Sequence, residues 1–265
     1  KWKDSNYSIL DKFSMRGRKG FVTGAAGGLG RNAAAALAQA GADVALVDLP
    51  SQEDKLTELA KDMSERFGTN GIALTCDVTD TVQVAELKTQ LVEQLGTVDF
   101  AFLNAGVNVP GDDQDATEEV WTRTININLN GTFTMMNAVY PHFKAAHAGT
   151  IVNVSSVAGK IGGGLLGTAA YASSKAGVNG LTKAVAKEGG KFGVRCNAVC
   201  PSLTLTDMTS ILSDENSQRI INGIPLGRAA QASEPAQMVL FFASDLASFV
   251  NGEIGDCDGG IVLDG

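Results

Sequence analysis

The amino-acid sequence predicts an α/β fold, a single doubly wound domain of the Rossmann type with a parallel sheet flanked by helices. Short apolar segments alternate along the chain with longer segments in which apolar residues recur at helical spacing. The apolar segments are continuous rather than alternating with polar residues, which is typical of parallel strands buried on both faces. A glycine-rich segment also separates the first apolar segment from the first helical one. Together these observations favour one open parallel sheet.

The first half of the chain contains strand-like segments separated by helix-like segments. The predicted strands are residues 20–24, 43–48, 72–76 and 98–103. The predicted helices between them run over about 29–40, 53–67 and 82–95. Because right-handed crossovers join parallel strands, this repeat predicts helices on both faces of the sheet.

The same alternation continues through the second half, with one irregular interval. We expect a long helix over about 118–147, a strand over 150–154, a helix starting near Tyr171, a strand over 193–199, a helix starting near Glu234 and a final strand and turn within 252–260. Residues 202–223 are interpreted as a substrate loop, because long irregular connections are usually functional. Residues 1–12 are expected to form an N-terminal extension and residues 13–265 a single domain.

Composition and charge argue against several classes of function. The 265 residues carry a formal net charge of −8 and a pI near 4.8, which disfavours nucleic acid and anionic membranes as partners. No apolar segment is long enough to span a membrane, and the polar N-terminal residues do not resemble a secretory signal, so we expect a cytoplasmic protein. The four cysteines and two histidines show no zinc-binding spacing, and we expect no metal.

Residues 23–30 (TGAAGGLG) follow the first predicted strand and open the first predicted helix. A pyrophosphate can bind there, because the first N–H groups of a helix are free and its N-terminal end carries a partial positive charge. Asp48 ends the second predicted strand, where a carboxylate can accept hydrogen bonds from the ribose of an adenosine group. The same carboxylate would repel a 2′-phosphate, and residues 49–51 offer no cation, so the sequence favours NAD over NADP.

Tyr171 and Lys175 lie four residues apart in a predicted helix, so their side chains share one face. A free tyrosine has a pKa of about 10, and a neighbouring ammonium lowers this pKa by stabilising the phenolate. The pair alone is a weak pattern, because this spacing occurs by chance on many helices.

Several further motifs occur in the same order and at suitable intervals. They are TGAAGGLG at 23–30, Asn104-Ala105-Gly106, NLNG at 128–131, Ser155-Ser156 and YASSK at 171–175. On these motifs the chain resembles the short-chain dehydrogenase/reductase family from about Phe13 to Gly260. The motifs are individually modest but jointly very specific. The resemblance implies a Rossmann-type domain that uses a nicotinamide cofactor to interconvert an alcohol and a ketone.

The resemblance implies a catalytic set of four residues. Tyr171 would exchange a proton with the substrate oxygen, and Lys175 would lower the pKa of Tyr171 and hold the nicotinamide ribose. Ser156 would donate a hydrogen bond to the substrate oxygen and stabilise its developing charge. Asn128 would hold a water of a proton relay behind the lysine.

The resemblance also implies a cofactor site. Thr206 would contact the nicotinamide carboxamide, and Asp77 would contact the adenine. The full set expected to contact NAD is Gly24, Gly28, Leu29, Gly30, Asp48, Asp77, Val78, Asn104, Ala105, Gly106, Tyr171, Lys175, Pro201, Leu203, Thr204 and Thr206. The chain departs from the family pattern at Ser202, where glycine is usual, and in the longer interval before Tyr171, which should reshape the substrate pocket.

The residues expected to face a substrate are mostly neutral and apolar. They are Val107, Asn108, Val157, Leu165, Leu166, Leu203, Leu205 and Met208. A phosphate or carboxylate would require a cation, and only Lys160 lies nearby, so we favour a neutral secondary alcohol or its ketone. A sugar alcohol would match Asn108 and the acidic residues in 111–115, whereas a hydroxysteroid-like alcohol would match the leucines, and both alternatives stay open.

Two other functions are compatible with parts of the sequence. Lys183, Lys187 and Lys191 could bind an acidic carrier protein, as in a 3-oxoacyl carrier-protein-type reductase, but a solvated helix face is the ordinary explanation, and the acidic chain and Asp48 favour it. A non-catalytic NAD-sensing regulator could keep the fold without turnover, but it would have little reason to retain the complete catalytic set. The resemblance further implies a homotetramer.

Overall fold

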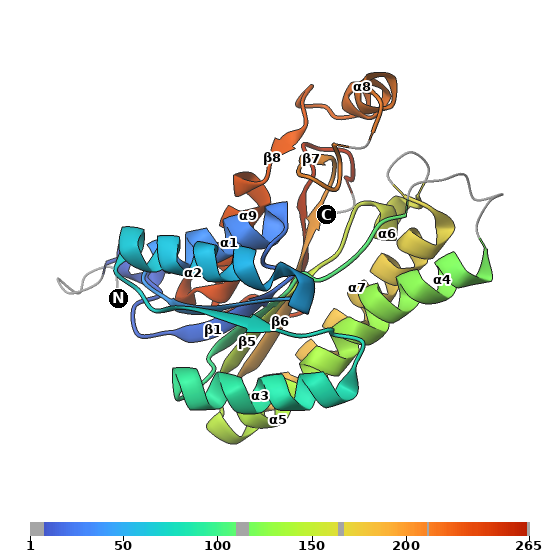
Figure 1. Cartoon of the computed structure of the whole chain (residues 1–265). Coiled ribbons are helices and arrows are strands. Elements are labelled where there is room, and N and C mark those ends of the chain that lie inside the picture. Colours follow the sequence, from blue (N-terminus) through green and yellow to red (C-terminus); the bar gives the residue numbers. More distant parts are fainter. Residues whose placement is uncertain (1–7, 110–116, 164–166, 211, 264–265) are drawn as a thin grey trace.

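The computed structural model describes residues 8–109, 117–163, 167–210 and 212–263. One seven-stranded parallel sheet dominates this part of the chain, in the order β3-β2-β1-β4-β5-β6-β9 (Figure 1). The strands are β1 (Lys19–Thr23), β2 (Asp43–Asp48), β3 (Gly71–Thr75), β4 (Phe100–Leu103), β5 (Gly149–Val154), β6 (Val194–Pro201) and β9 (Ile254–Cys257). The strand order reverses between β1 and β4, which confirms the predicted doubly wound fold.

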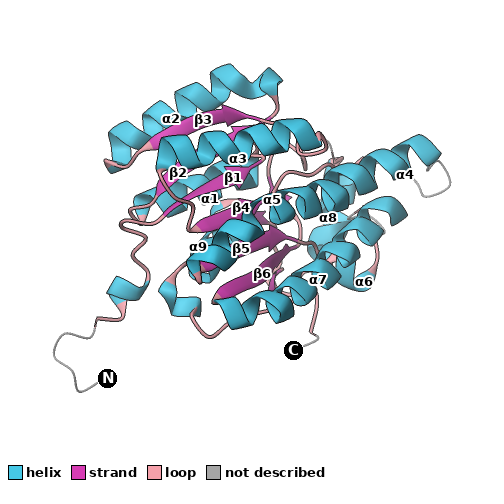
Figure 2. Cartoon of the chain, turned by 90° about the horizontal axis from the view of Figure 1, so that it is seen from below, coloured by secondary structure: helices cyan, strands magenta, loops and turns pink. Residues whose placement is uncertain are grey.

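Helices cover both faces of the sheet (Figure 2). One layer contains α1 (Gly28–Gln39), α2 (Glu53–Phe67) and α9 (Ser233–Ala243), and the other contains α3 (Thr81–Leu95), α5 (Thr132–Ala146) and α7 (Ala169–Gly189). In β2, Val44 and Leu46 pack into the first layer, whereas Ala45 and Val47 pack into the second. Because both faces are covered, the strands are continuous apolar runs in the sequence.

The helix expected over 118–147 consists of three consecutive segments. α4 (Glu118–Ile125) continues into a π-helical turn at Asn126–Gly131, and α5 then begins at Thr132. A π-helical turn is wider than an α-helical turn and occurs frequently at functional sites. The apolar pattern in the sequence did not reveal this turn, which holds Asn128.

Residues 202–223, expected to be irregular, contain two regular elements. β7 (Thr204–Leu205) pairs with β8 (Ala230–Gln231), and α8 (Asp214–Asn222) follows. The Ser213 hydroxyl caps α8 by accepting a hydrogen bond from the Asn216 N–H at 3.2 Å.

The remaining helical segments are short. They are α6 (Ala158–Ile161) and the 3-10 turns Leu10–Lys12, Pro50–Gln52, Gly190–Phe192 and Asp245–Ala247. Within the described ranges, no helix combines the length and apolar character that crossing a membrane requires.

Candidate active site

A cavity of about 810 Å³ lies at the carboxyl ends of the parallel strands, at the point where β1 and β4 lead toward opposite edges of the sheet. Ligands of open α/β sheets bind at this topological switch point. Every residue predicted to contact a cofactor lines the cavity except Gly30, and the lining set is Gly24, Gly28, Leu29, Asp48, Asp77, Val78, Asn104, Ala105, Gly106, Tyr171, Lys175, Pro201, Leu203, Thr204 and Thr206. Of the predicted catalytic set, Ser156 also lines the cavity, whereas Asn128 is buried and does not belong to the lining.

The glycines at the start of α1 are required by close contacts. A Cβ on Gly28 would lie 2.7 Å from the Thr206 side chain, and a Cβ on Gly30 would overlap the Gly24 carbonyl. Gly24 itself has a φ of +65°, which favours glycine. Gly27 is the N-cap residue of α1 and has no side chain to cap it, and Gly27, Gly28 and Leu29 line the cavity at this end of the helix. This turn from Gly24 to Gly30, called the glycine cradle below, fits a pyrophosphate.

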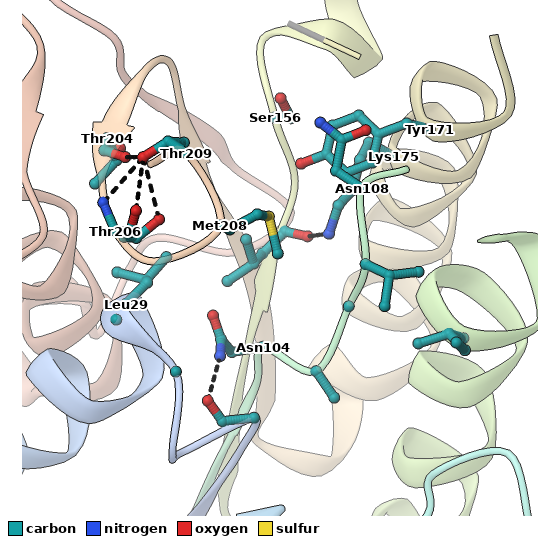
Figure 3. A pocket seen from close by; sticks show the side chains of 18 of the residues that line it. Leu29, Asn104, Asn108, Ser156, Tyr171, Lys175, Thr204, Thr206, Met208 and Thr209 are labelled. Carbon is teal, nitrogen blue, oxygen red and sulfur yellow. Dashed lines mark hydrogen bonds between the residues drawn. The ribbon is translucent and has the colours of Figure 1, made fainter. Parts of the chain in front are cut away.

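Asn104 joins the two strands that separate at the switch point. Its backbone N–H donates to Thr23 Oγ1 at 3.0 Å, and its Nδ2 donates to the carbonyls of Thr23 and Gly24 at 3.1 Å each (Figure 3). The amide therefore holds the glycine-rich turn against the end of β4. Asn104 therefore has a structural role in addition to its predicted contact with the cofactor.

Two carboxylates line the cavity on the β2 and β3 side of the switch point, whereas Tyr171 lies on α7, which follows β5 on the other side. Asp48 Oδ2 accepts from the Ala26 N–H at 3.0 Å, and Oδ1 accepts from the Leu49 N–H at 2.8 Å. Asp77 Oδ1 accepts from the N–H and hydroxyl of Thr79 at 2.9 and 2.7 Å. Arg123 and Lys175 are the basic residues among the described lining, and neither belongs to the segments that carry these carboxylates.

Ser156, Tyr171 and Lys175 come together beside the cavity (Figure 3). Tyr171 and Lys175 project from the first turns of α7, whose N-terminus is capped by the Thr168 hydroxyl. Lys175 Nζ donates to the Val154 carbonyl at 2.9 Å and lies 5.7 Å from the centroid of the Tyr171 ring. Ser156 Oγ accepts from the Ala158 N–H at 3.2 Å, which fixes the hydroxyl while leaving its proton available.

Burial dominates the ionisation of both α7 residues. Burial raises the pKa of Tyr171, and the neighbouring Ser156 hydroxyl partly offsets this rise by favouring the phenolate. Burial also lowers the pKa of Lys175 to about 8, so the side chain remains mainly protonated at neutral pH. The lowering of the Tyr171 pKa by Lys175 stays a prediction, because the ammonium here contacts the Val154 carbonyl.

Asn128 fixes backbone rather than facing the cavity. Its Oδ1 accepts from the Val107 N–H at 2.8 Å, and its Nδ2 donates to the Val107 carbonyl at 2.9 Å and to Ser174 Oγ at 3.0 Å. The π-helical turn places this buried side chain between the end of β4 and α7. The side-chain amide thus holds the segment that follows Gly106, and its role in a proton relay stays a prediction.

Comparison with known proteins gives consistent relatives. The family model adh_short_C2, described as enoyl-(acyl carrier protein) reductase, matches residues 24–262. The chain is 37% identical over 250 residues to the 3-oxoacyl-[acyl-carrier-protein] reductase FabG of Thermotoga maritima, covering 94% of this chain and 99% of that protein. It is 39% identical over 244 residues to the trans-4-hydroxycyclohexanecarboxylate dehydrogenase of Sinomonas cyclohexanicum, covering 90% of each. The chain belongs to the short-chain dehydrogenase/reductase family.

Solved structures extend this likeness to three dimensions. The structure of a candidate NAD(P)-dependent gluconate 5-dehydrogenase from Beutenbergia cavernae, which holds NADP at low occupancy, has a TM-score of 0.88 and 32% identity to this chain. The match covers 94% of this chain and 98% of that one. The resemblance inferred from the motifs is therefore confirmed, and the chain is an oxidoreductase of the short-chain dehydrogenase/reductase type.

Several residues of this short-chain dehydrogenase/reductase differ from their expected placement. Among the described residues, neither Val157, which is buried in a small core cluster, nor Leu205, which is 53% exposed, lines the cavity. Lys160, expected near the substrate, instead forms an ion pair with Asp256 at 2.9 Å. Leu165, Leu166 and the acidic residues of 111–115 lie outside the described residues.

The sequence also left some cavity residues unassigned. Among them are Arg123, Ile127, Thr209, Leu212 and Asn216. Arg123 and Ile127 lie four apart on α4 and its continuation, so helical spacing toward the NLNG motif could have indicated them. Thr209, Leu212 and Asn216 come from the interval expected to be irregular, for which no spacing rule applied.

We expect Lys175→Met to raise the free energy of unfolding at pH 7 by about 1–3 kcal/mol while abolishing turnover. The ordinary lysine pKa of 10.5 falls to about 8 in the folded state, so the unfolded chain binds more protons between these values. Wild-type stability therefore rises with pH through this window, and the advantage of the methionine variant shrinks. Urea unfolding at pH 7 and pH 10.5 measures this. A Lys175→Met variant that is less stable than wild type at pH 7 would contradict the prediction. Lys183→Met is the control, because Lys183 is exposed and the same substitution there removes a charge without a burial penalty.

Proposed function

We propose that this protein is an NAD(H)-dependent oxidoreductase that interconverts a neutral secondary alcohol and its ketone. The observation that carries the proposal is one cavity that joins the glycine cradle and Asp48 at one end to Ser156 and Tyr171 at the other. The acidic adenosine end supports NAD, because a 2′-phosphate there would meet a carboxylate without a described cation beside it.

The chain's own groups supply positioning and proton transfer. Ser156 and Tyr171 would both donate hydrogen bonds to the oxygen of a ketone, since the Ser156 proton is not used by the Ala158 contact. Tyr171 Oη would give its proton to that oxygen during reduction and remove it during oxidation. Lys175 would favour the phenolate through its charge. Bound nicotinamide would supply or accept the hydride.

Apolar groups support a neutral substrate. Val107, Leu203, Met208 and Leu212 line the cavity, and Asn108, Thr168 and Asn216 add polar groups to the lining. This mixture fits an alcohol with one or two additional oxygen groups as well as a larger hydrophobic one, so a sugar alcohol and a hydroxysteroid-like alcohol both belong to the proposal.

A carrier-bound 3-oxoacyl substrate is the second candidate, and the Thermotoga maritima relative favours it. Lys183, Lys187 and Lys191 are exposed along α7 and the turn after it, where an acidic carrier protein could bind. The acidic charge of the chain as a whole opposes such docking.

The proposal of a homotetramer is supported by Trp121 and Phe133, which are 44% and 54% exposed on α4 and α5.

The test is a panel assay that follows reduced nicotinamide with NAD or NADP. We expect turnover with NAD on at least one neutral secondary alcohol among sugar alcohols, hydroxysteroids and simple alcohols. Activity only on carrier-linked 3-oxoacyl chains, lost in a Lys183→Glu/Lys187→Glu variant, would favour the second candidate. Tight NADH binding without turnover on any substrate would favour the NAD-sensing regulator instead.

A further inference from the structure

The Thr209 hydroxyl lies at the centre of the segment that follows β6. Its Oγ1 is 2.7 Å from the Thr204 carbonyl and 3.0 Å from the Thr206 carbonyl (Figure 3). The same oxygen is 3.0 Å from the Thr206 N–H nitrogen and 3.4 Å from Thr206 Oγ1. One side chain therefore contacts three polar groups of Thr206 from only three positions along the chain.

The chemistry of a hydroxyl decides the direction of each of these bonds. A threonine hydroxyl has one proton to donate and two lone pairs that accept. The Thr209 proton goes to the carbonyls, of which Thr204 O is the nearer. The Thr206 N–H donates to Thr209 Oγ1, and the Thr206 hydroxyl must also donate to it, because the single Thr209 proton is already used.

Thr206 is held from a second side by the start of α1. The space where a Cβ on Gly28 would stand is occupied by Thr206, whose Cβ and Cγ2 both lie 2.7 Å from that point. The methyl group thus packs against the glycine cradle while the hydroxyl points to Thr209. Thr206 also lines the cavity.

We propose that Thr209 is a positioning residue that makes Thr206 a hydrogen-bond acceptor toward the cavity. With its N–H and hydroxyl protons both directed at Thr209, Thr206 offers only oxygen lone pairs to a ligand. The site then selects an N–H donor, such as the NH₂ of a nicotinamide carboxamide, over a group of similar shape that lacks one. This inference rests on the proposed NAD(H)-dependent function.

Two ligands that differ at this one group provide the test. In 3-acetylpyridine adenine dinucleotide a methyl group replaces the NH₂ of NAD, while the carbonyl remains. Isothermal titration calorimetry gives both Kd values without requiring turnover. We expect wild type to bind NAD about tenfold more tightly than the analogue, because the analogue leaves the Thr206 acceptor unpaired.

Thr209→Val keeps the shape of the side chain and removes its hydroxyl, which frees the Thr206 proton to point into the cavity. We expect the preference for NAD to fall about tenfold, to near equality. Thr209→Ser keeps the hydroxyl and should retain the preference. Ser210→Ala removes a neighbouring hydroxyl whose one hydrogen bond within the described residues goes to the Asp207 carbonyl, so it is the matched control. Thermal melting shows whether each variant folds, and Thr209→Ala replaces the valine variant if that fails.

The outcomes separate this inference from the proposed function. An NAD preference that is unchanged in the Thr209 variant overturns it. A parallel loss of affinity for both ligands overturns it too, because Thr209 would then only hold the loop. A wild-type protein that binds no NAD overturns both the inference and the proposed cofactor, whereas wild-type NAD binding with no selectivity overturns the inference alone.

Discussion

Tyr171→Phe is expected to lower turnover by about 10²–10⁴-fold while leaving the Kd for NADH nearly unchanged. The substitution removes the hydroxyl proposed to move the proton but keeps the ring, which packs against Gly167 so closely that a Cβ there would overlap it. Initial rates on the alcohol found in the panel, together with fluorescence titration of NADH, measure both quantities. Retention of more than about a tenth of the wild-type rate would show that another group moves the proton.

The pH dependence of the same variant gives an independent readout. Burial raises the pKa of Tyr171, so the phenolate required for alcohol oxidation becomes more abundant as pH increases. Wild-type oxidation should therefore accelerate with pH in the alkaline range, and the residual activity of Tyr171→Phe should not. Tyr140→Phe is the matched control, since Tyr140 lies on α5 and outside the described cavity lining.

The sheet was predictable because its signals are local. In β2, each residue of Val44 to Val47 is buried against one of the two helical layers, so the strand appears as a continuous apolar run. The turn and helix that follow β1 were similarly marked by glycines. Since parallel strands end at one edge of the sheet, residues after the strands could be placed around one cavity from the sequence.

The remaining features depend on contacts between distant segments. Asn128 was recognisable by its motif, but its use in holding Val107 follows from the π-helical turn, which an apolar pattern does not encode. Gly30 does not line the cavity and makes room for the Gly24 carbonyl, so its expected contact with a cofactor stays a prediction. The pKa shift of Lys175 depends on burial under the completed fold, which no spacing along the chain reveals.

Asp48→Asn combined with Leu49→Arg is expected to shift the ratio of the NAD and NADP dissociation constants by about 10²–10³-fold in favour of NADP. Unit charges 4 Å apart interact by about 4 kcal/mol at an effective dielectric constant of 20, and each 1.4 kcal/mol changes a Kd about tenfold. Removing the carboxylate charge ends the repulsion of a 2′-phosphate. The side chain at 49, which is 45% exposed, can carry a guanidinium without burial.

Asparagine is the appropriate replacement because it preserves an oxygen for the Ala26 N–H, which Asp48 Oδ2 now accepts at 3.0 Å. Titration of NAD and NADP into wild type, Asp48→Asn, Leu49→Arg and the double variant separates the two contributions. If wild type already binds both cofactors equally, the assignment of Asp48 is wrong. If Leu49→Arg alone gains as much NADP affinity as the double variant, the lack of a cation rather than the carboxylate excludes NADP, and the neutral Asp48→Asn variant should then still prefer NAD.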